Sequence, residues 1–411
     1  MSGCPVRKLE PDGRVSSPAL ELVQDDAGDR WVVRSFGVAR QVLRDSEATR
    51  QAGFGAESVR RGSESRAAKN GGSAASPAMR PPILYLEGPD HRRQRSAAAR
   101  FFAPKVIEDY RPMMTSLSEQ LVARLRPDRD VDLRGLAMEL AVQVAGRVVG
   151  LTNSSTRGMS CRLDTFFAGN PLEVGRGRGP VALLQTLRFG TATARFYYLD
   201  VKPAIRARRR RPQEDVISQL LADGFSDLEI LTECVTYAAA GMATTRELIC
   251  MAAWHLLDDA DLLARYRAGS LDDRAALLSE TLRLEPVVGH LYRRLTQPLL
   301  LDVAGEPYEL APGSLVDLDL RAVNADADTV GEEPYGLCPG RELPRTVPAA
   351  VMGFGDGHHR CPGGPLAILE TEIFLSALFA HDVVAGGPPR VHWNAVSQGY
   401  DLDQFRVRAA A

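Results

Sequence analysis

One cysteine, Cys361, stands in a turn whose residue types suit metal chemistry. Phe354 lies seven positions before it, glycines lie six and four before it, and His359 lies two before it. A thiolate that ligates iron needs a tight turn and backbone N–H groups directed at its sulfur. Glycines give the backbone the positive φ angles that such a turn requires. The residue types around Cys361 therefore suit a thiolate that binds a metal.

A second cysteine, Cys338, also precedes Pro and Gly, so this triplet alone does not distinguish the two. Only Cys361 has the upstream Phe and glycines, and only Cys361 is followed by apolar residues at helical spacing, over 366–375. A thiolate at the N-terminal end of that helix is stabilised by the helix dipole and by backbone donors. The alternative for Cys361 is a buried structural cysteine in a glycine-rich turn, which the many matched positions disfavour.

The segment 354–364 meets every fixed position of F-x-x-G-x-H-x-C-x-G. This pattern resembles the ligand loop of the cytochrome P450 family. The resemblance implies that the cofactor is haem b (iron protoporphyrin IX) and that Cys361 is its iron ligand. It also implies that Phe354, Gly355 and Gly363 surround the cofactor.

The resemblance implies a mainly α fold with small β-sheets, arranged as one P450-like haem domain. Length alone would suggest two or three domains, and the family pattern overrides that estimate. The segment 60–86 is small, polar and without periodicity in its first part, which is typical of a mobile loop, although a plain solvated linker is the alternative. The expected parts of the domain 1–411 are a strand and helix in 30–60, a flexible substrate lid in 60–86 with its other half in 165–200, a central oxygen-activating helix in 228–258 and the haem-thiolate loop in 354–364.

Haem carries two propionates that need cations. His91 and Arg95 lie four apart in a predicted helix, hence on one face, and resemble the family's H-x-x-x-R. Arg293 and His359 match the other propionate-binding positions, with Arg294 as the competitor for Arg293. Each residue alone could be an ordinary surface charge, but four accidental matches are improbable.

Glu280 and Arg283 lie three apart in a helical run that ends at a proline. The spacing is common, because Glu108 and Arg111 share it, and the position before the β-rich segment singles out the first pair. It resembles the family's E-x-x-R motif, which implies completion by Arg341 from a later loop. A buried cluster of this kind is costly unless fully hydrogen-bonded, so its role is expected to be structural.

The run 239–245 resembles the oxygen-activating segment A-G-x-(D/E)-T of the family. The resemblance implies that Gly241 permits a close approach to haem, with a kink that makes room for dioxygen, and that Thr244 takes part in oxygen activation. The acid of the pattern is absent, because Ala243 stands in its place. In the family that acid delivers protons for O–O cleavage, a role that alanine cannot fill.

Three explanations of Ala243 remain open. Glu247 lies one turn further on and could relay protons through water. The substrate could supply its own acidic or hydroxyl group. The reaction could also depart from the usual monooxygenase route, for example as oxidative coupling or rearrangement. We expect an altered proton relay combined with an unusual biosynthetic reaction.

The chain has 411 residues, 45% of them hydrophobic, and a formal net charge of −2, which argues against nucleic acid as a partner. Scattered cysteines without a disulfide framework, and no targeting or membrane-spanning segment, predict a cytoplasmic protein with no membrane partner. No dinucleotide or flavin fingerprint is present, so electrons are expected from ferredoxin and ferredoxin reductase. A basic patch expected to receive an acidic ferredoxin comprises Arg92, Arg93, Arg100 and Lys105, and a solvated helix face is the alternative for each of them.

The resemblance implies an oxidoreductase that uses O2 on a small, moderately apolar natural-product intermediate, aromatic or cyclic and free or carrier-bound. Its pocket is expected to be lined by 60–86, 165–200, 237–245 and 287–292. Two other functions are weighed. A peroxide-dependent enzyme is disfavoured because such relatives place Arg-Pro where Ala243 and Thr244 stand. A non-catalytic haem-binding protein is disfavoured by Gly241 and Thr244 but left open by Ala243.

Overall fold

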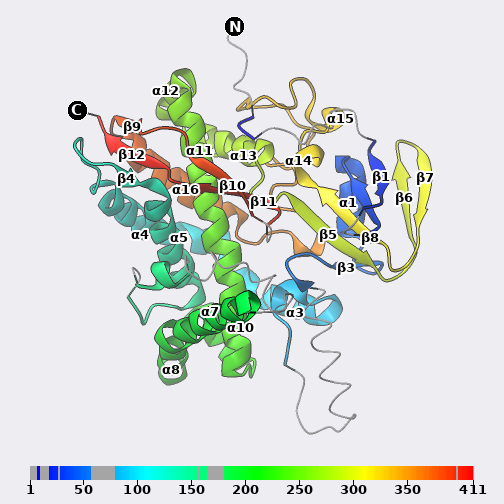
Figure 1. Cartoon of the computed structure of the whole chain (residues 1–411), viewed down its shortest axis with the longest axis horizontal. Helices are drawn as coiled ribbons and strands as arrows, with labels where there is room; N and C mark the ends of the chain where they lie inside the picture. Colours follow the sequence, from blue (N-terminus) through cyan, green and yellow to red (C-terminus); the bar gives the residue numbers. More distant parts are fainter. Residues whose placement is uncertain are drawn as a thin grey trace. The chain divides into compact units, whose positions relative to one another are not determined.

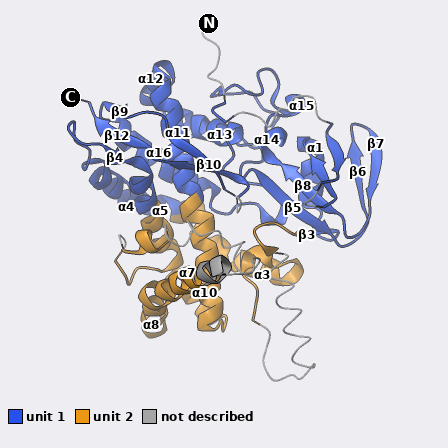
Figure 2. Cartoon of the chain, viewed as in Figure 1, with its two compact units in different colours: residues 1–50, 107–140, 244–411 blue, residues 51–106, 141–243 orange. Residues whose placement is uncertain are grey.

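The computed structural model describes residues 7–9, 18–25, 28–56, 79–155, 158–163, 180–394 and 397–410. The chain forms two compact units, which Figure 2 shows in blue and orange. Unit 1 comprises residues 1–50, 107–140 and 244–411, and unit 2 comprises residues 51–106 and 141–243.

The main sheet of unit 1 has the strand order β1-β2-β8-β5-β3. β2 and β8 are parallel with Trp31 opposite Val316, whereas β5 and β8 are antiparallel with Arg293 opposite Val316. The expected strand at 31–33 is present as β2, and the expected β-rich segment after Pro286 is present as β5 to β8 (Figure 1). The strand bounds are β1 Leu20–Val23, β2 Arg30–Val33, β3 Thr49–Gln51, β5 His290–Leu295, β6 Leu299–Val303, β7 Glu306–Leu310 and β8 Leu315–Asp319.

One face of α1 (Phe36–Arg44) packs on this sheet, because apolar residues recur along the helix at helical spacing. Phe36, Val42 and Leu43 are buried against sheet residues such as Val316 and Leu318. This core holds the end of α1 in place, and α1 in turn contacts the turn η5 (Gly357–His359).

Helices make up most of the rest of unit 1. Their bounds are α4 Pro104–Val122 and α5 Leu133–Val149, which both begin or end in unit 2, and α11 Thr244–Asp258, α12 Ala260–Ala268, α13 Leu271–Leu284, α14 Leu320–Val323, α15 Ala327–Val330 and α16 Gly364–Phe379. Short strands form two further sheets, one with the order β4-β12-β9 and one made of β10 and β11. Their bounds are β4 Val131–Asp132, β9 Val383–Ala385, β10 Arg390–Asn394, β11 Gly399–Asp403 and β12 Arg406–Ala409.

Unit 2 is helical over its described residues. Its elements are η1 Ile83–Tyr85, α3 Gly88–Ala99, η2 Arg100–Phe102, α7 Pro180–Phe196, η3 Tyr197–Val201, α8 Lys202–Arg210, α9 Val216–Ala222, α10 Asp227–Ala238 and the π-helical turn η4 Ala239–Ala243. Two parts of the expected substrate lid, 60–78 and 165–179, lie outside the described residues, so the lid stays a prediction.

One helical path links α10, η4 and α11 without a break from Asp227 to Asp258, close to the segment 228–258 expected from sequence. It begins with a capping box in which Ser226 and Glu229 satisfy each other's backbone N–H groups. In the part of the chain that the structure describes, no helix is long and apolar enough to cross a membrane.

Candidate functional site

The turn that precedes α16 is closed by short backbone hydrogen bonds. The N–H of Cys361 donates to the carbonyl of Phe354 at 2.9 Å, and the N–H of Gly355 donates to Met352 at 2.8 Å. Gly355 and Gly357 have φ angles of +67° and +68°, which residues with a Cβ adopt only at a cost. The positive φ angles therefore explain why glycines stand at these positions, as the predicted tight turn requires.

The same turn is fastened to α1 within unit 1. The carboxylate of Asp356 accepts from Arg44 at 3.0 Å and lies 3.4 Å from Arg40. A Cβ on Gly357 would lie 1.9 Å from the carbonyl oxygen of Leu43. Close approach of the backbone to α1, and not only the positive φ, requires glycine at position 357.

Cys361 is exposed and forms no disulfide, and it lies three positions before Gly364, the first residue of α16. Cys234 and Cys250 are free but buried, and burial raises the pKa of both thiols. A ligand thiol must be accessible and able to lose its proton. Burial works against both conditions at Cys234 and Cys250, whereas Cys361 is exposed.

The rival Cys338 is disulfide-bonded. The sequence analysis expected no disulfide framework, and this expectation was wrong for Cys338. The spacing of cysteines along a chain carries no information on which thiols the fold brings together. The disulfide removes Cys338 as a competing thiolate.

The central helix widens where the sequence analysis expected a kink. Residues Ala239–Ala243 form a π-helical turn, a feature that often marks functional sites. An added Cβ on Gly241 would meet the Cβ of Ala145 at 3.7 Å, an ordinary contact, as its nearest neighbour among the described residues. Protein packing therefore does not demand a glycine here, which fits the expectation that a cofactor does. Ala243 and Thr244 are both partly exposed.

The carboxyl group of Glu247 is enclosed by its neighbours in unit 1. One oxygen accepts from Arg246 Nε at 2.6 Å, and the other accepts from the N–H of Leu402 in β11 at 2.8 Å. The side chain is 2% exposed. Burial raises the pKa of Glu247 to about 7, against the opposing effect of the adjacent Arg246. A buried carboxyl with this pKa can exchange a proton near neutral pH.

The structure brings together the three residues of the expected structural cluster. Arg283 donates to both oxygens of Glu280, at 2.7 and 2.8 Å, and Arg341 donates to Glu280 at 2.9 Å. Arg283 also donates to the carbonyls of Asn324, Pro334 and Gly336. Each charge is thus hydrogen-bonded, which a buried ionic cluster needs in order not to destabilise the fold.

Comparisons with known proteins agree with this geometry. The family model for cytochrome P450 matches residues 275–381, the part that holds Glu280, Arg283, Arg341 and Cys361. Cytochrome P450 107B1 of Saccharopolyspora erythraea is 27% identical over 397 residues, which cover 93% of this chain and 90% of that protein. Cyclomarin C epoxidase CymV of Salinispora arenicola is 28% identical over 310 residues, covering 72% of each chain.

The fold gives the same answer. The crystal structure of P450BioI in complex with an acyl carrier protein carrying hexadec-9Z-enoic acid has a TM-score of 0.76 at 23% identity, covering 95% of both chains. This chain belongs to the cytochrome P450 family. It is a haem-thiolate oxidoreductase of the monooxygenase type whose cofactor is haem b.

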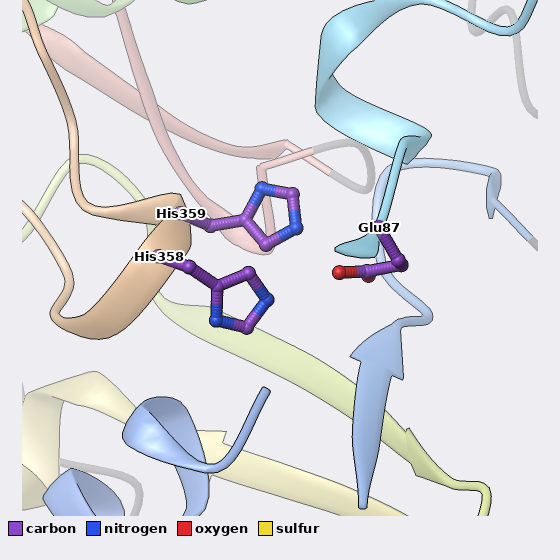
Figure 3. A group of neighbouring side chains, drawn as sticks. All are labelled: Glu87, His358 and His359. Atoms are coloured by element: carbon purple, nitrogen blue, oxygen red, sulfur yellow. The ribbon is translucent and has the colours of Figure 1, made fainter. Parts of the chain in front are cut away.

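The P450 residues expected near the haem propionates divide between the two units. In unit 1, His358 and His359 project side by side from η5, with ring centroids 4.5 Å apart (Figure 3). Arg293 in β5 is 2% exposed, whereas Arg294 is partly exposed and donates to the carbonyl of Gly313. The buried position suits a cation that faces a cofactor, and it supports the choice of Arg293 over Arg294.

In unit 2, His91 and Arg95 lie on α3 one turn apart. His91 is 2% exposed and Arg95 is partly exposed. The helix begins after Glu87, which Figure 3 also draws and whose carboxylate accepts from the N–H of Gln51 at 2.6 Å. The α3 register predicted from sequence is therefore present, and the two side chains share one helix face.

The remaining loop residues lie beside the P450 cysteine. The ring of Phe354 is so close to Gly364 that a Cβ there would meet it at 3.2 Å. Gly363 is the residue that immediately precedes α16. Phe354, Gly355, His359, Cys361 and Gly363 thus form one contiguous turn.

Sequence reasoning missed two contributors to this P450 site. Asp356 anchors the cysteine turn to α1, and Asp401 contacts Arg246 at 2.8 Å. Asp356 lies inside the recognised motif, so its charge was a usable signal. Asp401 lies in a C-terminal strand that carries no motif, so only the fold reveals it.

Proposed function

We propose that this P450 oxidises a small, moderately apolar natural-product intermediate, aromatic or cyclic, with O2 and with electrons from ferredoxin and ferredoxin reductase. The observation that carries the proposal is the exposed Cys361, which forms no disulfide, in a closed turn before α16. A relative named cyclomarin C epoxidase supports the proposal of an oxidation. P450BioI was solved with a carrier-bound fatty acid, so delivery on a carrier protein belongs among the substrates to test.

In this proposal Cys361 is the iron ligand, and Phe354, Gly355 and Gly363 shape the turn around it. The bound haem supplies dioxygen activation and oxygen transfer. Four basic side chains, those of His91, Arg95, Arg293 and His359, would hold the propionates. Glu280, Arg283 and Arg341 keep the surrounding fold in place and take no part in the chemistry.

The central helix orients oxygen and its protons. Gly241 leaves room beside the cofactor, and the Thr244 hydroxyl donates a hydrogen bond where oxygen is activated. Ala243 provides no proton donor at the position where the family has an acid. Glu247, four residues further along the helix from Ala243 and with a pKa of about 7, is the proposed source of the proton.

Replacing Cys361 tests the proposal directly. Wild-type protein reconstituted with haem is expected to give the red-shifted carbon monoxide spectrum of a thiolate-ligated, reduced haem. Cys361→Ser and Cys361→His should lose that band, whereas Cys161→Ser, which removes another exposed cysteine outside any disulfide, should keep it. A band that survives in both Cys361 variants would contradict the assignment.

The substrate class is tested by titrating the ferric protein with a natural-product library and following the haem Soret band. A ligand that displaces iron-bound water shifts the band to shorter wavelength, and aromatic or cyclic compounds are expected among the hits. If free compounds give no shift and a carrier-bound substrate does, delivery on a carrier protein is indicated. A set of hits made only of polar, acyclic compounds would contradict the substrate class.

Ala243 favours a second candidate, a non-hydroxylating oxidation such as oxidative coupling or rearrangement. Isotopically labelled dioxygen separates the two outcomes. Label in the product supports oxygen insertion, whereas an oxidised product without label supports coupling or rearrangement. Turnover with peroxide but not with a reductase pair would point instead to the peroxide-dependent alternative.

A further inference from the structure

A second carboxyl group adjoins Glu247 within unit 1. Arg246, on α11, donates from Nε to Glu247 at 2.6 Å and from Nη2 to Asp401 Oδ1, on β11, at 2.8 Å. Asn394 Nδ2, on β10, donates to Asp401 Oδ2 at 2.9 Å. The negative charge of Asp401 also acts on Glu247. One guanidinium thus bridges two neighbouring acids.

One positive charge faces two acids in this cluster. Arg246 offsets a single negative charge, so the carboxyl pair favours holding one proton. Burial, with the negative charge of Asp401 beside it, raises the pKa of Glu247 to about 7. The cluster therefore stores one exchangeable proton near neutral pH.

The cluster also spans from solvent to the buried helix. The Asp401 side chain is 29% exposed, whereas Arg246 and Glu247 are 3% and 2% exposed. On the helix, Glu247 lies three residues after Thr244 and four after Ala243, which places it one turn along the same face. A proton that enters at Asp401 arrives one helical turn from the oxygen-activating threonine.

We propose that Asp401 is the solvent-side member of a proton relay in which it recharges Glu247, and that this carboxyl pair replaces the acid missing at position 243. The inference rests on the proposed function and adds the entry point for protons. The Glu247 carboxyl releases its proton through water toward the Thr244 hydroxyl, Asp401 returns one to Glu247, and solvent reprotonates Asp401. Each proton consumed in reducing O2 is thus matched by one from solvent, while the electrons come from the redox partner.

Other titratable groups around the pair do not compete for this role. Cys250, next along α11, and Tyr400, beside Asp401 on β11, are buried, and burial raises the pKa of each well above its ordinary value. The Tyr400 hydroxyl also donates to the carbonyl of Glu285 at 3.2 Å. Among the described groups of this cluster, Asp401 is therefore the one that connects Glu247, whose pKa is near neutral, to solvent.

Asp401→Asn provides the decisive variant, because it keeps the oxygen that accepts from Arg246 and removes the proton carrier. In a reconstituted system we expect the product formed per reductant to fall roughly tenfold to a hundredfold, with peroxide release rising in its place. The fall should be steeper as pH rises. Asp403→Asn is the matched control: it makes the same change two residues along β11, on an aspartate that accepts from the N–H of Gln404.

Infrared difference spectroscopy supplies a readout that does not depend on turnover. Wild-type protein at neutral pH should show a protonated-carboxyl band that is lost in Glu247→Gln and shifted in Asp401→Asn. Adding Ala243→Asp to Asp401→Asn should restore coupling, because it returns an acid to the family position. If Asp401→Asn does not fold, the relay is tested by the coupling of Asp401→Glu and by the infrared measurement on wild-type protein.

Several results would overturn the relay. These are equal coupling and equal pH profiles for Asp401→Asn and Asp403→Asn, no Glu247-dependent carboxyl band, or no restoration by Ala243→Asp. Each would leave a structural clamp between α11 and β11 as the role of the cluster. The carbon monoxide spectrum separates this failure from failure of the proposed function, because an intact thiolate band in the variants keeps the function while the relay falls.

Discussion

Glu370 on α16 is a buried carboxyl with no visible role in the proposed chemistry. It is 3% exposed, and its Oε1 has no hydrogen-bond partner among the described residues. Burial alone raises the pKa of Glu370 to about 8. In the folded protein this side chain is therefore neutral at neutral pH, in contrast to Glu280, whose charge is met by two arginines.

A stability measurement against pH tests this state. Because the folded pKa lies above the ordinary value of 4.5, the neutral Glu370 contributes stability at low pH that is lost as pH rises toward about 8. Glu370→Gln should remove that loss, and near pH 8 it should unfold with a free energy higher than wild type by on the order of 2 kcal/mol. Chemical denaturation across this pH range measures the difference.

Glu372→Gln is the control on the same helix. Its carboxylate accepts from Ser376 at 2.7 Å and from Arg274 at 3.3 Å, so removing its charge should lower stability at neutral pH. Equal pH dependence of wild type and Glu370→Gln would show that Glu370 is solvated or paired in solution.

At the scale of elements, the cysteine turn depends on how closely α1 approaches it. Gly357 and Gly340 both have positive φ, +68° and +85°. A Cβ on Gly340 meets nothing within 4 Å, whereas a Cβ on Gly357 would lie 1.9 Å from the carbonyl oxygen of Leu43. The two positions separate the cost of the backbone angle from the cost of the steric clash.

Alanine substitution at both glycines should therefore have different effects. Gly340→Ala is expected to cost roughly 1–2 kcal/mol, from the left-handed conformation alone. Gly357→Ala should cost clearly more and also reduce haem retention, because the turn must move away from α1. Thermal unfolding and haem content of the purified variants measure both effects. Equal losses at the two positions would mean that the turn relaxes without disturbing Cys361.

At the scale of the whole molecule, electrons must reach the protein from a partner. The expected landing patch in unit 2 is exposed at Arg92, Arg93, Arg100 and Lys105. Arg93 is paired with Asp90 on the same helix, so Arg92 and Lys105 are the better positions for charge reversal. Complementary charge acts mainly on the rate of association and is screened by salt.

Reversing the charge of Arg92 and Lys105 to glutamate should slow reduction by an acidic ferredoxin roughly tenfold at low ionic strength. The difference should shrink as salt is added. Arg210→Glu on α8, also in unit 2 and also exposed, should leave the rate nearly unchanged. Stopped-flow reduction measures all three proteins, and equal slowing by Arg210→Glu would mean that net charge matters and the patch does not.

Local chemistry was readable from sequence because its determinants are contiguous. Cys361, its glycines and Phe354 lie in one turn, so their spacing indicated the motif before any fold was known. The same holds for the central helix, expected over 228–258 and found from Asp227 to Asp258, because Gly241 and Thr244 lie within one short motif. Spacing alone did not identify the buried ionic cluster, because Glu108 and Arg111 have the same spacing as Glu280 and Arg283 but form an exposed pair.

The tertiary structure decided every feature that depends on distant segments. Arg341 meets Glu280 across 61 positions, and Asp401 meets Arg246 across 155. Neither contact leaves a periodic pattern in the chain, because such pairing depends on how loops and strands pack. The disulfide of Cys338 was missed for the same reason. Sequence by itself determined the ligand turn and the family, whereas burial and long-range contacts decided which charges stand alone, which are paired and which can carry a proton.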